Sequence, residues 1–453
     1  MPHVSEQPDL FSTRRPPQDQ RRFISPAVEK TIEQTRSHIR DPELAWLFSN
    51  CFPNTLDTTI TAGKDDTFVI TGDIDAMWLR DSTAQVWPYL PLLREDDALR
   101  RLIAGIIRRQ AACVLLDPYA NAFEASTEVP TKWKSDQTDM RPGVHERKYE
   151  LDSLCSVIRL SVGYFKSCGD SACFDENWHR AIELILQTIR VEQRGSDERE
   201  ASPYRFARKA FRATDTQPLA DGLCYPYRKC GMSRSPFRPS DDACQFAYPI
   251  AANAMAVVCL RDLAELWRKL DFNPAIATQA SQLSHEIDAG IKQFGVQQHP
   301  TFGEIYAYEV DGLGSRIFMD DANVPSLLSL PYLGYCDRND PIYQRTRRYV
   351  LSRENPFFSE GTAGAGVGGP HVGLGWIWPM SIILRALTSS EENEIRECLR
   401  MLKRSHAGTG FMHESFWKDD AAKFTRPWFA WANALFGELI LILARERPDL
   451  LSA

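Results

Sequence analysis

Six segments of the chain bring together carboxylates, arginines, histidines and aromatic residues. They lie at residues 71–82, 144–153, 237–249, 319–335, 361–379 and 410–433. Carboxylate and guanidinium groups can bind hydroxyl groups in bidentate fashion, and a Trp or Tyr ring can cover the C–H face of a sugar. This mixture indicates a carbohydrate site. Its density of carboxylates is higher than a simple sugar-binding protein needs.

Two positions offer carboxylates for general acid and general base chemistry. Asp241 and Asp242 follow a Pro-Ser pair at the predicted start of a helix, where a capping function alone would explain one of them. Glu414 lies in a loop ahead of the last predicted helix. Taken locally, Glu414 is either a solvated loop charge or a catalyst, and both interpretations stay open.

The motifs for diphosphate binding, dinucleotide binding, metal binding and serine-hydrolase chemistry are absent or incomplete. None of the five Asp-Asp pairs extends to the Asp-Asp-x-x-Asp that would bind magnesium and a diphosphate. The glycine run 364–369 is followed at once by Pro370, so it cannot open the helix of a dinucleotide fold. His145, His371 and His413 lack the spacing of metal ligands, and neither HExxH nor GxSxG occurs. The sequence therefore predicts neither a cofactor nor a metal.

Helical periodicity recurs along the chain, most clearly where five aliphatic residues from 99 to 107 share one helix face. Twelve helices are predicted near 28–48, 80–94, 98–115, 149–166, 174–192, 243–267, 276–294, 322–333, 341–352, 371–387, 391–404 and 427–446. Strands are expected only at 67–70 and 302–310, and 193–222 is expected to be a polar loop.

No flexible linker divides these helices, and no repeat of the length that a helical solenoid requires is present. We therefore expect one mainly helical domain over 26–453, built as a closed ring of inner and outer helices. Its long loops would gather at one end and form a pocket. Residues 1–25, rich in Pro, Gln and Arg, are expected to be a mobile or draped arm.

Composition limits the partners. The chain has 60 acidic and 53 basic residues and a net charge of −7, which disfavours a nucleic acid or an anionic membrane. No apolar run approaches the ~18 residues that a membrane span needs, and the first 22 residues lack the apolar stretch of a secretory signal. An intracellular protein is therefore expected. The 11 Trp residues are divided between core packing and sugar stacking, and composition alone does not decide between them.

The motifs GDIDAMWLRDS, ERKYELDSLC, FRPSDDA, MDDANVPSLLSLPYLGY and the block from HESF to RPWFAWAN occur in that order. In these segments the sequence resembles the metal-independent exo-α-1,6-mannosidases of glycoside hydrolase family 125. The resemblance implies an (α/α)6 barrel that releases terminal α-1,6-linked mannose from an oligosaccharide or N-glycan, with inversion and without a metal. It places the general acid on Asp241 or Asp242 and the general base on Glu414.

The terminal mannose is expected to contact six residues of the same segments, namely Trp78, Arg80, Asp81, Glu146, Arg238 and His371. Arg80 with Asp81 could instead form a buried ion pair, and Trp78 could belong to the core. Segments 223–236 and 361–371 depart from the pattern of this family. The resemblance therefore supports the reaction class more strongly than the preference for one linkage. Rival interpretations are another glycosidase, phosphorylase or epimerase on the same barrel, or a non-catalytic carbohydrate-binding ring. The oligomeric state is left open.

Overall fold

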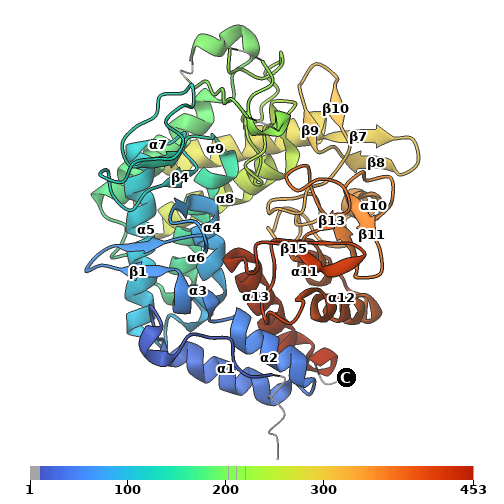
Figure 1. The fold of residues 1–453 in the computed structure, drawn as a ribbon. Helices are drawn as coiled ribbons and strands as arrows, with labels where there is room; N and C mark the ends of the chain where they lie inside the picture. Colours follow the sequence, from blue (N-terminus) through green and yellow to red (C-terminus); the bar gives the residue numbers. More distant parts are fainter. Residues whose placement is uncertain (1–10, 202–203, 211, 220, 452–453) are drawn as a thin grey trace, which may run out of the picture.

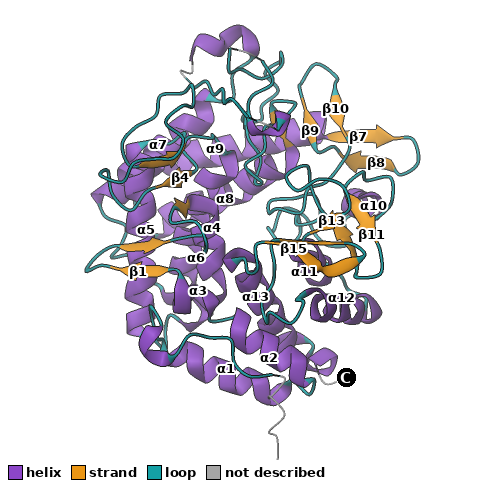
Figure 2. Cartoon of the chain, viewed as in Figure 1, coloured by secondary structure: helices purple, strands orange, loops and turns teal. Residues whose placement is uncertain are grey.

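Helices account for most of the regular structure (Figures 1 and 2). The computed structural model describes residues 11–201, 204–210, 212–219 and 221–451. Over these residues the α-helices are α1 Pro26–His38, α2 Pro42–Cys51, α3 Asn54–Thr58, α4 Leu79–Val86, α5 Asp97–Leu116, α6 Leu151–Cys168, α7 Glu176–Val191, α8 Ile250–Lys269, α9 Pro274–Gly290, α10 Pro341–Val350, α11 Pro379–Leu387, α12 Glu392–Ser405 and α13 Ala430–Glu446. None of them is long and apolar enough to span a lipid bilayer.

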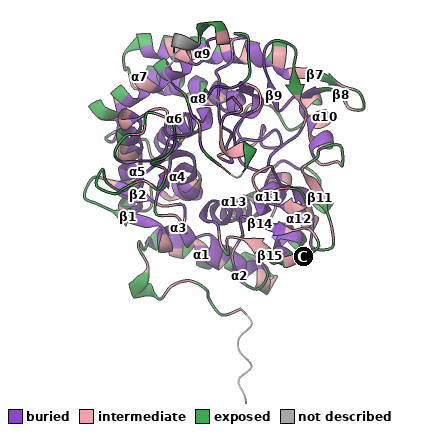
Figure 3. Cartoon of the chain, turned by 45° about the horizontal axis from the view of Figure 1, so that its top comes forward, coloured by how far each residue is buried: buried purple, intermediate pink, exposed green. Residues whose placement is uncertain are grey.

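The helices form two concentric layers. Neighbours along the inner layer contact one another as α11–α13–α4–α6–α8, and these five helices surround the centre of the ring in Figure 3. Helices α2, α5, α7, α9 and α12 pack outside them, each against its inner neighbours. Because inner and outer helices alternate along most of the chain, the inner helices run in the same direction and their N-termini meet at one end.

One inner position is not helical, so the helix predicted at 322–333 is wrong. Residues 328–334 form turns instead. The buried carboxylate of Asp320 accepts hydrogen bonds from the N–H groups of Leu327 and Leu328, at 2.9 and 3.0 Å, and two prolines in the segment offer no N–H donor. The segment lies against α13, where the Tyr332 hydroxyl donates to Glu438 at 2.8 Å.

The other predicted helices are present with altered bounds. The predicted helix 28–48 is divided into α1 and α2, because Asp41 caps the new helix that begins at Pro42. The predicted helix 80–94 continues from α4 as a 3-10 helix over Trp87–Leu92, which contains two prolines. Helices α8 and α11 begin seven or eight residues later than predicted, at Ile250 and Pro379.

Short antiparallel strands decorate the loops in six sheets of two or three strands. Their bounds are β1 Ile60–Ala62, β2 Thr67–Val69, β3 Met77–Trp78, β4 Ala122–Phe123, β5 Val144–Glu146, β6 Tyr248–Pro249, β7 Val296–His299, β8 Gly303–Tyr306, β9 Glu309–Val310, β10 Arg316–Ile317, β11 Phe358–Glu360, β12 Ala365–Val367, β13 Trp376–Ile377, β14 Ser415–Trp417 and β15 Asp420–Thr425. The strand predicted at 67–70 is β2, and the one predicted at 302–310 is divided into β8 and β9.

The N-terminal segment is draped over the body from residue 11 onward. The Trp46 indole donates to the carbonyl of Ser12 at 2.7 Å, and the guanidinium of Arg15 pairs with Asp57 at 2.7 Å and with Glu29 at 2.5 Å. These contacts tie residues 11–25 to α1, α2 and α3. The first ten residues of the predicted arm lie outside the described residues.

Candidate active site

A small pocket of about 50 Å³ lies where the inner helices begin. Trp78, Trp378 and Phe429 line it, and each is the residue that immediately precedes an inner helix. The direction shared by the inner helices therefore builds the site. Six of the nine predicted site residues line this pocket, namely Trp78, Arg80, Asp81, Asp241, His371 and Glu414.

Asp241 occupies a tight turn that presents its carboxyl to the pocket. Its φ of 64° is in the left-handed region, which a non-glycine residue rarely adopts. Its N–H donates to the carbonyl of Arg238 at 2.8 Å, while the N–H of Arg238 donates to the carbonyl of Asp242 at 2.9 Å. The Asp241 side chain is 26% exposed, against 5% for Asp242. Of the two aspartates, only Asp241 lines the pocket.

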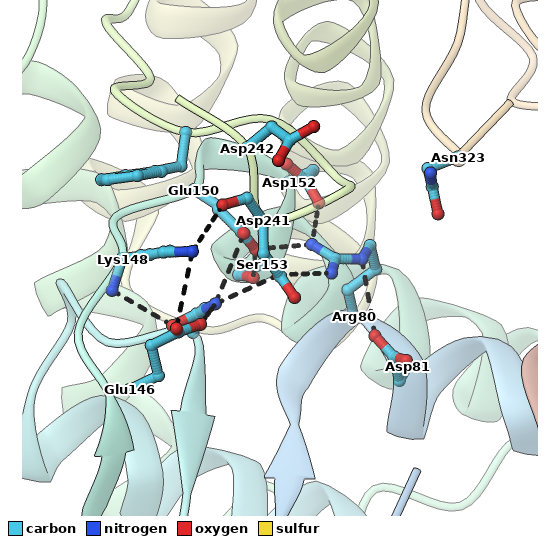
Figure 4. A network of polar contacts seen from close by, with 12 residues as sticks. Arg80, Asp81, Glu146, Lys148, Glu150, Asp152, Ser153, Asp241, Asp242 and Asn323 are labelled. Carbon is cyan, nitrogen blue, oxygen red and sulfur yellow. Dashed lines mark hydrogen bonds and ion pairs between the residues drawn. The ribbon is translucent and has the colours of Figure 1, made fainter. Parts of the chain in front are cut away.

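Arg80 is the centre of a buried cluster of charges beneath this turn (Figure 4). Its guanidinium donates to Asp241 at 3.1 Å, to Glu150 at 2.5 Å and to Asp152 at 3.1 Å. Asp81 lies 3.5 Å away, so the ion pair that the sequence allowed is present within a larger cluster. Burial raises the pKa of Asp81 to about 6, although the charge of Arg80 opposes that shift.

The carboxyl groups of Asp241 and Glu150 lie side by side, because both accept hydrogen bonds from Arg80 and from Asn121. Burial and the neighbouring Asp241 raise the pKa of Glu150 well above its ordinary value, against the opposing charge of Arg80. Burial would also raise the pKa of Asp241, but the charges of Arg80 and Lys148 outweigh it and lower the pKa to about 2. Burial and the neighbouring charges therefore favour the neutral form of Glu150 and the ionised form of Asp241.

His371 adds a positive charge at the opening of the pocket. Its Nδ1 lies 3.4 Å from Oδ1 of Asp242. Burial lowers the pKa of His371, yet the hydrogen bond to Asp242 and the charges of Asp242, Glu414 and Asp241 raise it to about 9. A protonated imidazole thus lies close to three carboxylates at neutral pH.

Glu414 is held by the hairpin of β14 and β15. The hydroxyl of Thr425 donates to Oε2 of Glu414 at 2.9 Å, and Arg426 donates to Oε1 at 3.3 Å. Arg426 also forms a two-point ion pair with Asp73 in the loop before α4. Because both Glu414 oxygens accept hydrogen bonds, its orientation in the pocket is fixed.

Three predicted site residues lie beneath the pocket rather than in its wall. Besides Asp242, Glu146 accepts from Asn121 at 3.1 Å and pairs with Arg208 at 2.8 Å. Arg238 donates to the carbonyl of Ala243 at 2.9 Å, within the turn that carries Asp241. These side chains are buried and do not line the pocket, so their contact with a sugar stays a prediction.

Sequence reasoning missed several residues of the site. Asn323, Arg426 and Trp431 line the pocket, and the Trp431 ring lies 5.5 Å below the guanidinium of Arg80. Trp431 belongs to the RPWFAWAN block, within the helix predicted at 427–446. Asn121 donates to both Glu146 and Asp241. No local sequence signal marks Asn121, because its partners come from distant segments.

The wall of this pocket combines aromatic rings with the carboxyl groups of Asp81, Asp241 and Glu414. Aromatic faces suit the C–H face of a sugar, and a protonated and an ionised carboxyl supply the acid and base of glycosidic-bond cleavage. Within the described ranges, no group of three or more His, Cys, Asp or Glu side chains is arranged to hold a metal ion.

Comparison with known proteins agrees with this chemistry. Residues 41–441 match the family model of the metal-independent α-mannosidases, GH125. The Meiotically up-regulated gene 157 protein of Schizosaccharomyces pombe is 46% identical over 97% of this chain and 89% of its own length.

Solved structures extend the match to three dimensions. A Streptococcus pneumoniae structure, described as a metal-independent α-mannosidase in a non-productive substrate complex with α-1,6-mannobiose, is 42% identical with a TM-score of 0.90. The match covers 93% of this chain and 99% of that one. A bacterial glucoamylase with acarbose is 13% identical with a TM-score of 0.52, over 92% of this chain and 59% of that one, and shares the fold alone.

These likenesses and the double ring of helices define an (α/α)6 toroid, the fold class that the sequence predicts. A toroid with this pocket is a glycoside hydrolase, so the non-catalytic ring is the wrong alternative. The chain belongs to glycoside hydrolase family 125, the metal-independent α-mannosidases.

Proposed function

We propose that the protein removes terminal α-1,6-linked mannose from the non-reducing end of an oligosaccharide or N-glycan, with inversion at the anomeric carbon. The observation that carries this proposal is the small pocket at one end of the toroid, into which Asp241 and Glu414 both project. The Streptococcus pneumoniae relative, described in complex with α-1,6-mannobiose, supports the choice of linkage.

Asp241 is the general acid in this proposal. It lines the pocket, whereas Asp242 is buried behind it beside His371. The acid must deliver a proton to the glycosidic oxygen as the C–O bond breaks. Glu150, whose pKa burial raises, lies beside Asp241 and is a source for this proton.

Glu414 is the general base. Its carboxylate removes a proton from water while that water attacks the anomeric carbon from the face opposite the leaving group. Thr425 and Arg426 hold the carboxylate in one orientation for this step. Inversion follows because a single displacement at the anomeric carbon reverses its configuration.

The remaining wall residues bind the mannose. The Trp78 ring offers a face for the sugar C–H groups, and Asp81 and Arg426 offer charged groups for its hydroxyls. Residues Pro239 and Ser240 close the wall next to the acid. The small size of the pocket suits a chain end rather than an internal stretch of sugars, as exo-action requires.

Incubation with α-1,6-, α-1,2- and α-1,3-mannobiose, followed by NMR, tests the proposal. We expect cleavage of the 1,6 isomer and initial release of β-mannose. Initial release of α-mannose contradicts inversion, and an uncleaved 1,6 isomer contradicts the linkage. Added phosphate should change neither rate nor product. Formation of mannose phosphate would instead identify a phosphorylase.

Matched variants test the assignment of the acid. Asp241→Asn should lower kcat on mannobiose by roughly 10²–10⁴-fold, the usual contribution of general acid–base catalysis. Asp242→Asn should cost about tenfold, because Asp242 acts only through His371. The reverse order of these two losses would move the acid to Asp242.

A further inference from the structure

The charged cluster beneath Asp241 holds more carboxyl groups than cations. The guanidinium of Arg80 contacts four carboxyl groups, those of Asp81, Glu150, Asp152 and Asp241. One positive charge cannot compensate four buried negative charges, and isolated buried carboxylates are costly.

The second cation of the cluster is already engaged. The ammonium of Lys148 donates to the carbonyl of Asp241 at 2.8 Å and to Asp215 at 2.6 Å, and Glu146 lies 3.5 Å from it. It therefore faces two further carboxyl groups. At least one carboxyl of the cluster has to keep its proton.

Glu150 is the member placed to keep that proton. Its side chain has no exposed surface, and it stands directly before the first residue of α6, at the floor of the site. Its Oε1 accepts from Asn121 at 3.4 Å, and its Oε2 accepts from Ser153 at 2.8 Å and from Arg80. Its remaining partner is the carboxyl of Asp241, which faces the pocket.

The two carboxyls thus differ in environment, because Glu150 is fully buried whereas Asp241 faces the pocket. Burial favours the neutral form of an acid, so a proton shared between them resides on Glu150 while water hydrates Asp241. When a sugar displaces that water, Asp241 loses the hydration that stabilised its charge. Its affinity for the proton then rises, next to the oxygen that must receive it.

We propose that Glu150 stores the proton of the catalytic acid and passes it to Asp241 when substrate fills the pocket. This inference rests on the proposed function, in which Asp241 is the general acid. Glu150 is accordingly a positioning residue that acts through Asp241 and does not touch the sugar.

The step balances in protons and electrons. The O–H bond of Glu150 breaks as an O–H bond forms on Asp241, and Asp241 then transfers that proton to the glycosidic oxygen while the C–O bond breaks. Glu414 takes one proton from the attacking water. Glu414 then releases its proton to the solvent, and a proton from the solvent restores the Glu150–Asp241 pair, so each turnover consumes only water.

Glu150→Gln tests the inference, because Gln keeps the shape of a neutral Glu but has no proton to give. We expect kcat/KM on α-1,6-mannobiose to fall by about 10²-fold. The rate on a dinitrophenyl α-mannoside should change by less than about threefold, because that leaving group departs without protonation.

The pH dependence of kcat/KM distinguishes proton storage from a purely structural effect of the substitution, because a structural effect would leave that dependence unchanged. In Glu150→Gln, Asp241 must hold the proton alone, and the Gln amide donates to its ionised form. The alkaline limb of kcat/KM should therefore move toward acid by about one pH unit or more. The charged or titratable groups that face the pair, all kept in the variant, are Arg80, Asp81, Glu146, Lys148, Asp152, Asp242, His371 and Glu414.

A second substitution keeps the test decisive if Glu150→Gln impairs folding. Glu150→Asp retains a proton-holding carboxyl in a shorter side chain, so activity should rank Glu over Asp over Gln. A structural function predicts the opposite order of the variants, because Gln matches the shape of Glu. That opposite order, or an unmoved alkaline limb in Glu150→Gln, overturns the inference.

Glu438→Gln is the matched control. Glu438 is another carboxyl whose pKa is raised by burial, near Arg159, but it lies in the middle of α13 and does not line the pocket. It should keep the wild-type rate and pH profile.

Asp241→Asn distinguishes failure of the proposed general acid from failure of the proposed proton storage. If Asp241→Asn cleaves mannobiose normally, the proposed acid is wrong; if it does not, and Glu150→Gln keeps the alkaline limb, only the stored proton is wrong.

Discussion

Individual side chains of this pocket have protonation states that depend on a few close neighbours. His371 is protonated because Asp242, Glu414 and Asp241 surround it, and burial next to Asp241 favours the neutral form of Glu150. The same residue types in water would have the opposite charge states near neutral pH. The catalytic properties of these residues therefore come from their placement in the cluster.

His371 should make stability depend on pH. Its pKa rises from 6.5 to about 9 on folding, so the stabilisation is fully present below pH 6.5 and is lost as the pH rises through 9. With a side chain one-third exposed, the loss should be about 1–2 kcal/mol in the free energy of unfolding. Urea unfolding below pH 6.5 and above pH 9 measures it.

The variant His371→Gln isolates this contribution from other groups that titrate in the same range. Its free energy of unfolding should fall less than that of the wild type across the interval. Equal losses in both proteins would show that His371 is not protonated in the folded state.

At the scale of elements, the sequence predicted correctly those helices that depend on a local pattern of apolar residues. The amphipathic segments 98–115 and 174–192 became α5 and α7 with bounds shifted by at most two residues. The segment 322–333 has a similar apolar content, but Asp320 captures its N–H groups from outside the segment. A helical pattern cannot reveal such a competing acceptor.

The site follows the same rule. The motif around Arg80 and Asp241 was recognisable, because its residues are contiguous in short segments. Asn121 and Glu150 were missed because their partners are distant in the sequence. Two partners of Asn121 are 25 and 120 positions away, and Glu150 is 70 positions from Arg80. Only the packing of the inner helices brings these residues together.

Asp320 should be essential to the non-helical inner segment. In Asp320→Asn, the amide nitrogen cannot accept, so one of the buried N–H groups of Leu327 and Leu328 loses its partner. An unsatisfied buried donor costs about 1–3 kcal/mol. We expect a lower Tm in thermal unfolding followed by circular dichroism.

Asp337→Asn provides the comparison, because the carboxyl of Asp337 accepts from the N–H of Asn339 at 2.7 Å in an exposed turn. Water can replace that contact, so its Tm should change little. If the two variants had equal Tm values, the turn segment would not depend on Asp320.

At the scale of the whole molecule, the ring is closed by its two ends. Helix α13 contacts α2, α3 and α4, so the last helix packs against the first part of the chain. The side chains of Asn433 and Asn54 are hydrogen-bonded at 3.0 Å across this closure. Pocket residues come from both ends too, from Trp78 to Trp431. The closure of the ring and the pocket therefore both use residues from the two ends of the chain, and the single domain expected over 26–453 predicts that they unfold together.

Gly437 is the most sensitive point of that junction. A Cβ at this position would lie 2.9 Å from the Phe52 ring and 3.1 Å from the Phe52 Cα, too close without a backbone shift. Gly437→Ala would stabilise an isolated helix, but here it should lower the free energy of unfolding by about 1–3 kcal/mol through overpacking. In a single domain, loss of activity, loss of helix signal and loss of tertiary signal should remain coincident during unfolding and shift together in the variant. Two separate transitions, of which Gly437→Ala moves only one, would instead show that the ring consists of parts that unfold independently.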